Sequence, residues 1–241
     1  MVRLSLQPEF ILSIAGFRVS NTLLTAVLTS LILIALTAVL RLGGRSRLWF
    51  LFEAIVDYSL KAMDLVTGDR AECKRVYPLA MTFLLFIVVA NWLVLIPGFL
   101  GSLVIIRDGR SFTLLKSPTA DFNVTLMLAA VSMVSVEYFS ISHLGLAKFI
   151  GRFINFSSWP LFISGLFELL SELIKVLSLS LRLFGNIFGG EVVIVIVSFL
   201  VPLIAPVLFY LLEFFVGFIQ AVIFAVLTLA YAKFSTQEQR A

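Results

Sequence analysis

The sequence predicts an all-α integral membrane protein with about five membrane helices, one amphipathic interfacial helix and a long, steeply tilted helical hairpin at the C-terminal end. Of the 241 residues, 61% are hydrophobic and only 13% are charged, whereas soluble domains are close to half apolar and a quarter charged. The apolar residues gather in runs of about 20 or more, the length that a helix needs to cross a bilayer. No polar stretch is long enough for a soluble domain, so we expect residues 1–241 to form a single membrane domain.

The N-terminal part is predicted to contain one membrane helix and one helix that lies flat in the interface. Residues 1–19 form a mixed outer segment, and a membrane helix over 21–42 ends at Gly43-Gly44. Residues 46–66 carry charges three or four residues apart and apolar side chains elsewhere, which is the pattern of an amphipathic interfacial helix. The charged residues of that face are Glu53, Asp57, Lys61 and Asp64.

Two further membrane helices are predicted in the middle of the chain. One covers 77–96 and stops at Pro97-Gly98, and the other covers 121–143. Asp121 is placed to be the N-cap of the second helix, because a short carboxylate can accept hydrogen bonds from the first free backbone N–H groups. The intervening segments are predicted to be loops, at 68–75, 98–119 and 145–159.

The C-terminal part begins with an apolar run that is too long for an upright membrane helix. Residues 161–200 would extend about 60 Å, twice the thickness of the hydrocarbon core. A helix of that length has to tilt steeply. Pro202 and Pro206 mark a turn before a last helix over 207–234, so the two helices are predicted to form a hairpin.

Lysine and arginine residues predict the orientation. Most of them lie around 41–47, 61–75 and 148–152 and in the C-terminal tail. The positive-inside rule then places the N-terminus outside and the C-terminus in the cytoplasm, as in a multi-pass protein of a bacterial plasma (inner) membrane. Loop residues of this kind also account for the net charge of +4, so we expect no nucleic-acid partner.

Arg182 is the most informative residue, because it lies inside the long apolar run. A guanidinium does not lose its proton in a medium of low dielectric constant. Placing one at the bilayer centre costs at least ~2.5–3.5 kcal/mol on insertion scales. Such a residue indicates a functional site.

Other polar residues share a helical face with Arg182. At 100° per residue the face includes Glu168, Glu172, Lys175, Asn186 and Gly190, while Glu191 points away from it. Lipid would not tolerate this stripe, which must therefore face protein or water. In the last helix, Glu213 and Gln220 share a face as well. Carboxylates on two helices around one fixed cation suit the passage of protons or other cations.

Structural explanations remain open for part of this pattern. Glu172 and Lys175 can neutralise each other at a spacing of three residues. Asn186 and Gln220 can hold two helices together, and the glycines can serve close packing. His143 is interpreted as a solvated interfacial residue, with a proton-relay role as the less favoured alternative. The pattern assigns no role to Glu137 or Lys175.

Four segments of the sequence resemble one known family, subunit a of the membrane sector of rotary F-type ATP synthases. The most specific is SLSLRLFGNIFGGE, from Ser178 to Glu191. FIQAVIFAVLT from Phe218 resembles the last helix of the family, and PTADFNVT from Pro118 resembles the entry to its fourth helix. VSNTLL from Val19 resembles the start of the first membrane helix, so the resemblance covers nearly the whole chain.

The resemblance implies a role for each site residue. Arg182 would be the stator arginine that faces the proton-carrying carboxylate of the rotor. Glu191 and Glu213 would line the outer aqueous half-channel, and Asn186 and Gln220 would lie close to the arginine. Ser178, Glu168 and Glu172 would belong to the inner half-channel. The segment after Trp92 departs from the family in lacking an acidic residue that some members have there.

The resemblance also implies the partners. They are the rotor c-ring, the peripheral-stalk subunit b, the other ATP synthase subunits and the lipid bilayer. The transported ion is either H⁺ or Na⁺, and the sequence does not decide between them. It likewise leaves open a bacterial or organellar origin, the rotor ring size and the net direction of the reaction. We expect no cofactor, no metal site and no catalysis by the chain alone, which contains no GxxxxGK[ST] phosphate loop.

The alternative function is a self-contained cation or proton transporter or channel. Such proteins commonly carry internal repeats with interrupted helices in both halves. Here the intramembrane charges gather after residue 160 and no repeat is visible. An intramembrane hydrolase is disfavoured because the single His143 and single Cys73 both lie near loops.

Overall fold

The computed structural model describes residues 9–14, 17–43, 47–67, 70–95, 104–107, 110–113, 115–153, 158–202 and 204–237. Within these ranges the chain is helical apart from two short β-hairpins, one 3₁₀ turn and a few linking residues, and five of the helices are long and apolar enough to span a membrane. The predicted all-α membrane fold is therefore confirmed. The helix-ending Pro97-Gly98 and the end of the C-terminal tail lie outside the described residues.

The first helix buries mainly polar residues. α1 covers Asn21–Leu42, with Ser20 as its N-cap, and its buried side is a row of polar residues. These are Asn21, Thr22, Thr25 and Thr29. The threonines at 25 and 29 donate their hydroxyl hydrogens to backbone carbonyls one turn earlier, so the row adds no unpaired hydroxyl donor to the interior.

The next two helices pack against each other. α2 covers Arg47–Thr67 and α3 covers Arg70–Leu95. The hydroxyls of Ser59 and Tyr77 join the two helices at 2.7 Å. The sequence predicted a loop over 68–75 and a helix from residue 77, and this prediction was wrong because α3 begins at Arg70. The charged residues at its start are those expected where a helix meets the membrane surface. They do not show where the helix begins.

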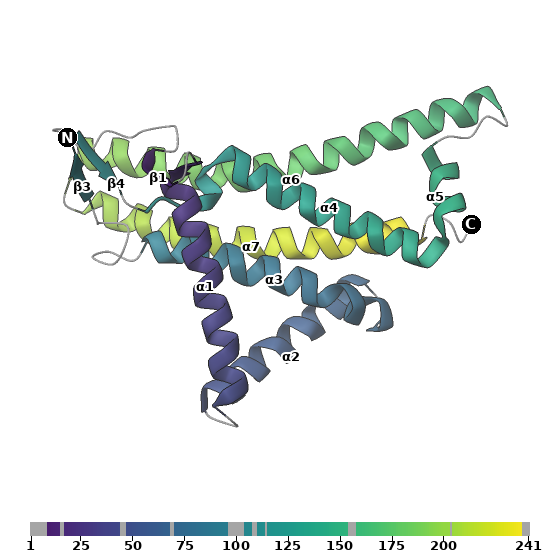
Figure 1. The fold of residues 1–241 in the computed structure, drawn as a ribbon, viewed down its shortest axis with the longest axis horizontal. Helices are drawn as coiled ribbons and strands as arrows, with labels where there is room; N and C mark the ends of the chain where they lie inside the picture. Colours follow the sequence, from purple (N-terminus) through teal and green to yellow (C-terminus); the bar gives the residue numbers. More distant parts are fainter. Residues whose placement is uncertain are drawn as a thin grey trace.

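Both hairpins were predicted to be irregular segments. β1 (Phe10–Ile14) pairs with β2 (Phe17–Ser20), and β3 (Val104–Arg107) pairs with β4 (Arg110–Thr113), both antiparallel. The second hairpin corrects the predicted loop over 98–119, and a 3₁₀ turn, η1 (Pro118–Ala120), follows it. In Figure 1 both hairpins lie at the end of the molecule where α6 and α7 are joined.

α4 covers Phe122–Leu144, and Asp121 is its N-cap, as predicted, with the side chain accepting from the Asn123 backbone N–H. A further short helix, α5 (Leu146–Phe153), lies within the segment 145–159 that was predicted to be a loop. α5 ends against α6 at Gly165, where an added Cβ would overlap the backbone of Phe153. A side chain at position 165 would therefore push α5 away.

The last two helices form the long hairpin. α6 covers Trp159–Leu200, 42 residues, and α7 covers Ala205–Gln237, 33 residues. At 1.5 Å per residue α6 is about 63 Å long, twice the hydrocarbon thickness of ~30 Å.

Four of the long helices share a common direction. Figure 1 shows α1 crossing the direction of α3, α4, α6 and α7.

The core lies among α3, α4, α6 and α7. Phe83 and Ile87 of α3 meet Leu179 and Leu183 of α6 and Phe224 of α7 in one buried cluster. Hydroxyl pairs add polar links between helices, Thr125 with Ser180 at 3.1 Å and Ser132 with Thr228 at 2.8 Å. Many leucine and phenylalanine side chains of α6 and α7 are exposed, which suits lipid or other membrane subunits.

Candidate functional site

Arg182 lies on an open face of α6. Its side chain is exposed, and Nη2 donates to Ser178 Oγ one turn earlier at 3.4 Å. Among the described residues, none of the acidic side chains forms an ion pair with this guanidinium. An added Cβ at Gly185 or Gly189, next to it on the helix, would meet no atom within 4 Å. The positive charge thus points away from this chain.

Asn186 and Gln220 join the two helices of the hairpin one turn beyond Arg182. Asn186 Nδ2 donates to Gln220 Oε1 at 2.7 Å, and Gln220 is only 3% exposed. Both amides were sequence-predicted site residues. The hydrogen bond between them fits the helix-holding explanation, and it lies one turn beyond Arg182 on α6.

Glu191, Glu213 and Lys116 form a first cluster, which is named the outer cluster after its predicted side of the membrane. Lys116 Nζ lies 3.7 Å from Glu191 Oε2. Glu213 is buried, lies close enough to Glu191 for the two charges to repel, and its Oε2 receives no hydrogen bond from any described residue. Gly190 makes room for it, since an added Cβ there would lie 3.0 Å from Glu213 Cδ.

Asn91 of α3 lies near this outer cluster and was not predicted. Its Oδ1 accepts hydrogen bonds from Ser117, at 3.0 Å, and from Thr119. Its amide nitrogen lies 3.4 Å from the position of a Cβ added at Gly217, one turn after Glu213 on α7. The sequence alone could not place Asn91, because an asparagine within an apolar helix carries no sign of which helix it faces.

A second cluster, named the inner cluster after its predicted side of the membrane, consists of Glu137, Arg152, Glu168, Glu172 and Lys175. Arg152 of α5 donates to Glu168 and, at 3.1 Å, to Glu172, and Lys175 lies 2.8 Å from Glu172 Oε1. Burial disfavours the charge of the Arg152 side chain, which is 8% exposed, but the hydrogen bond and charge of Glu168 and the charge of Glu172 outweigh burial and raise the pKa of Arg152. Glu137 of α4 lies beside Glu172.

The sequence did not predict Glu137 and Arg152 as members of the inner cluster. Glu137 comes from α4 and Arg152 from α5, whereas the predicted polar stripe lies on α6. The ion pair between Glu172 and Lys175 is present, as the structural explanation required. His143 is exposed at the end of α4, and its Nε2 lies 2.6 Å from Arg75 Nη1. The polar contact of His143 is therefore with Arg75 of α3, and neither residue belongs to the inner cluster.

The two clusters lie on opposite sides of Arg182 along α6. Glu172 precedes it by ten residues and Glu191 follows it by nine, which corresponds to about 15 Å and 13.5 Å of helix axis. Each cluster lies between helices, whereas Arg182 faces outward. The arrangement provides two separate sets of titratable groups with a fixed positive charge between them.

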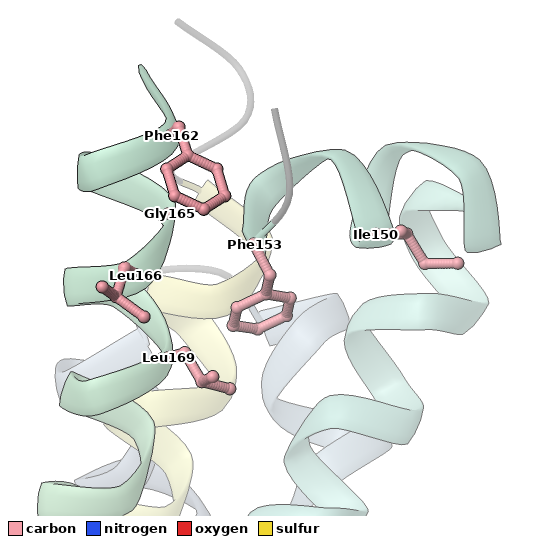
Figure 2. Close-up of a pocket in the computed structure, with 6 residues that line it drawn as sticks. All are labelled: Ile150, Phe153, Phe162, Gly165, Leu166 and Leu169. Carbon is pink, nitrogen blue, oxygen red and sulfur yellow. The ribbon is translucent and has the colours of Figure 1, made fainter. Parts of the chain in front are cut away.

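An apolar pocket of about 320 Å³ lies between α5 and α6, close to the inner cluster. Figure 2 shows the side chains around it, which are Ile150, Phe153, Phe162, Leu166 and Leu169, together with Gly165. None of these side chains can carry a proton. Among the described residues, no group of three or more His, Cys, Asp or Glu side chains is arranged to hold a metal ion.

Comparison with known proteins identifies the family. The sequence pattern of the family described as ATP synthase A chain matches residues 19–233. ATP synthase subunit a of Acidothermus cellulolyticus is 32% identical over 90% of this chain and 76% of that relative. Subunit a of Mycobacterium tuberculosis is 34% identical over 88% and 85%, and that of Legionella pneumophila is 30% identical over 92% and 89%. The chain therefore belongs to the ATP synthase A chain family, the stator subunit a of the proton-translocating sector of F-type ATP synthases.

Proposed function

We propose that Arg182 is the fixed charge that the carboxyl groups of a rotor ring pass one after another. The observation that carries this proposal is the exposed guanidinium without an acidic partner in the described part of the chain, on an apolar surface. A charge in that position requires an anion from a neighbouring subunit. A rotor carboxylate beside Arg182 is stabilised in its ionised form and releases its proton. Away from the arginine and facing lipid, it has to be protonated.

The outer and inner clusters would be the ends of two offset half-channels. In this proposal Glu191 and Glu213 serve the outer one, and Glu168, Glu172 and Ser178 serve the inner one. Asn186 and Gln220 lie close to Arg182, between the two. A buried carboxylate oxygen requires a donor, and in an aqueous half-channel water supplies it at Glu213. Because a proton enters by one half-channel and leaves by the other, it can cross only with the rotor. Arg182 blocks the direct route.

The wider assembly follows from the same proposal. The partners are a rotor c-ring on the open face of α6, the peripheral-stalk subunit b and other ATP synthase subunits in a bacterial plasma membrane. The hairpins and the α6–α7 turn lie at one end of the molecule, and α5 lies at the other (Figure 1). With Lys148 and Arg152 on α5, the positive-inside rule favours a cytoplasmic α5 and an outer N-terminus. The transported ion is H⁺ in this proposal.

The test is ATP-driven proton pumping in inverted vesicles that carry the assembled complex. We expect Arg182→Ala to abolish pumping while the complex still assembles and hydrolyses ATP. Arg41→Ala is the matched control, because Arg41 is an exposed arginine in the last turn of α1, and we expect it to pump as the wild type does. Unchanged pumping by Arg182→Ala would show that the arginine is structural and would reopen the alternative of a self-contained transporter.

A further inference from the structure

The inner cluster contains one carboxyl group that its cations attract but to which they donate no hydrogen bond. Both carboxylate oxygens of Glu137, on α4, are buried and receive no hydrogen bond from any described residue. On α6, Glu172 Oε1 accepts from Arg152 and Lys175, while Oε2 is also buried and without a donor among the described residues. The two carboxyl groups lie within hydrogen-bonding reach of each other. Two acceptors therefore face each other across the α4–α6 contact.

A single proton resolves this conflict. Ionised carboxylates are acceptors only, so two of them in contact repel each other and leave buried oxygens unsatisfied. A proton on one of them makes it a donor to the other. The count of charges agrees, since three carboxyl groups, at 137, 168 and 172, surround the two cations Arg152 and Lys175. With one proton held, the cluster is neutral, as a position within a bilayer requires.

The groups around the pair come from three elements. Arg152 reaches it from α5, Glu168 and Lys175 are on α6, and α7 contributes Tyr231, whose ring lies 5.6 Å from Lys175 Nζ. Lys175 is thus held between Glu172 and the ring and stabilises the negative charge that the pair retains. The cations fix the position of Glu172, and Glu137 remains the partner with which it can exchange a proton.

We propose that Glu137 and Glu172 share one proton and form the proton-holding pair of the inner half-channel. This inference rests on the proposed function and adds Glu137 to its residues. Glu172 precedes Arg182 by about 15 Å along α6, and Ser178, which hydrogen-bonds Arg182, lies between them. A proton released by the rotor on this side passes Ser178, is taken up by the pair and leaves from it at the α5 end.

The experiment compares Glu137→Gln, Glu172→Gln and the double variant in the assembled complex. Infrared difference spectra in H₂O and D₂O report the carbonyl band of a buried protonated carboxyl group. Because one proton is shared, we expect each single variant and the double variant to remove the same one band. ATP-driven proton pumping in Glu137→Gln should fall about tenfold, less than the ~10²–10⁴ of a directly transferring group, since water offers a slower route.

Glu53→Gln is the matched control, because Glu53 is exposed on α2 and undergoes the same chemical change. We expect it to keep both the band and the pumping rate. A glutamine at 137 can donate to Glu172 Oε2, which favours assembly. Should that variant fail to assemble, Glu137→Asp keeps a titratable group, and we expect it to retain a shifted band.

Three results would overturn the proposal: two independent bands, a band that stays in both glutamine single variants or is not shifted in Glu137→Asp, or wild-type pumping by Glu137→Gln at every pH tested. Arg182→Ala separates this failure from that of the proposed function. If Arg182→Ala stops pumping and Glu137→Gln does not slow it, the stator role stands and the shared proton is refuted. If Arg182→Ala pumps normally, the proposed function itself is wrong.

Discussion

Replacing Gly190 by alanine tests whether the outer cluster depends on a close approach of α6 and α7. The new methyl group would lie 3.0 Å from Glu213 Cδ and 3.1 Å from Oε1, several tenths of an ångström inside an ordinary contact. Glu213 is only 5% exposed, so its carboxyl group has to move within the cluster. Overpacking of this kind costs about 1–3 kcal/mol, and alanine returns about 0.5–1 kcal/mol of helix propensity. Stability should therefore fall by about 0–2.5 kcal/mol.

Function should change more than stability. A displacement of about 1 Å in a reacting group can cost up to 10²-fold in rate, so we expect the initial rate of ATP-driven pumping by Gly190→Ala to fall about tenfold in vesicles with equal amounts of complex. Gly151→Ala is the control, since an added Cβ at this glycine in α5 meets no atom within 4 Å. It should pump at the wild-type rate.

A second substitution isolates the steric cause. Glu213→Asp shortens the side chain by one methylene, which makes room for the methyl group at position 190. In that background Gly190→Ala should slow pumping by much less than in the wild type, whatever the effect of Glu213→Asp alone. An equal loss in both backgrounds, or wild-type pumping by Gly190→Ala alone, would refute the reasoning.

Two further predictions concern the links between helices. Asn186→Ala and Gln220→Ala should slow pumping by similar factors, because each removes the same hydrogen bond. The double variant should then be no slower than the slower single variant. Losses that multiply in the double variant would contradict this. Ser132→Ala removes a buried hydroxyl pair and should destabilise the detergent-solubilised protein by about 1 kcal/mol in thermal unfolding. Ser135→Ala should change the unfolding temperature little, because Ser135 is only partly buried and donates its hydroxyl hydrogen to Val131 of the same helix. A shift equal to that of Ser132→Ala would argue against the interhelical bond.

The long helices could be predicted because hydropathy along the chain records burial in lipid directly. The elements that were missed are those for which this signal is weak. α5 has only eight residues, shorter than any membrane span, and the β3–β4 hairpin lies between polar residues that also suit a loop. The start of α3 was misplaced because a helix that leaves the membrane continues through charged residues without a change in backbone structure.

The site was predictable only in part, for a related reason. Arg182, Glu168 and Glu172 share one face of one helix, and helical periodicity displays such a stripe. Glu137 and Arg152 reach the same cluster from other helices, and Lys116 reaches Glu191 from outside the helices altogether. Spacing along a chain carries no information about such partners, which depend on how the helices pack.

The order of charges along the chain has a consequence for membrane insertion. Lys116 precedes its partner Glu191, and Arg152 precedes Glu168 and Glu172. During synthesis from the N-terminus, each of these acids therefore emerges when its cation has already been made. α6 can enter the bilayer with its carboxylates neutralised by earlier segments, before α7 exists. A rearranged chain with α5 transferred to the C-terminus should consequently insert α6 poorly, even though it contains the same residues.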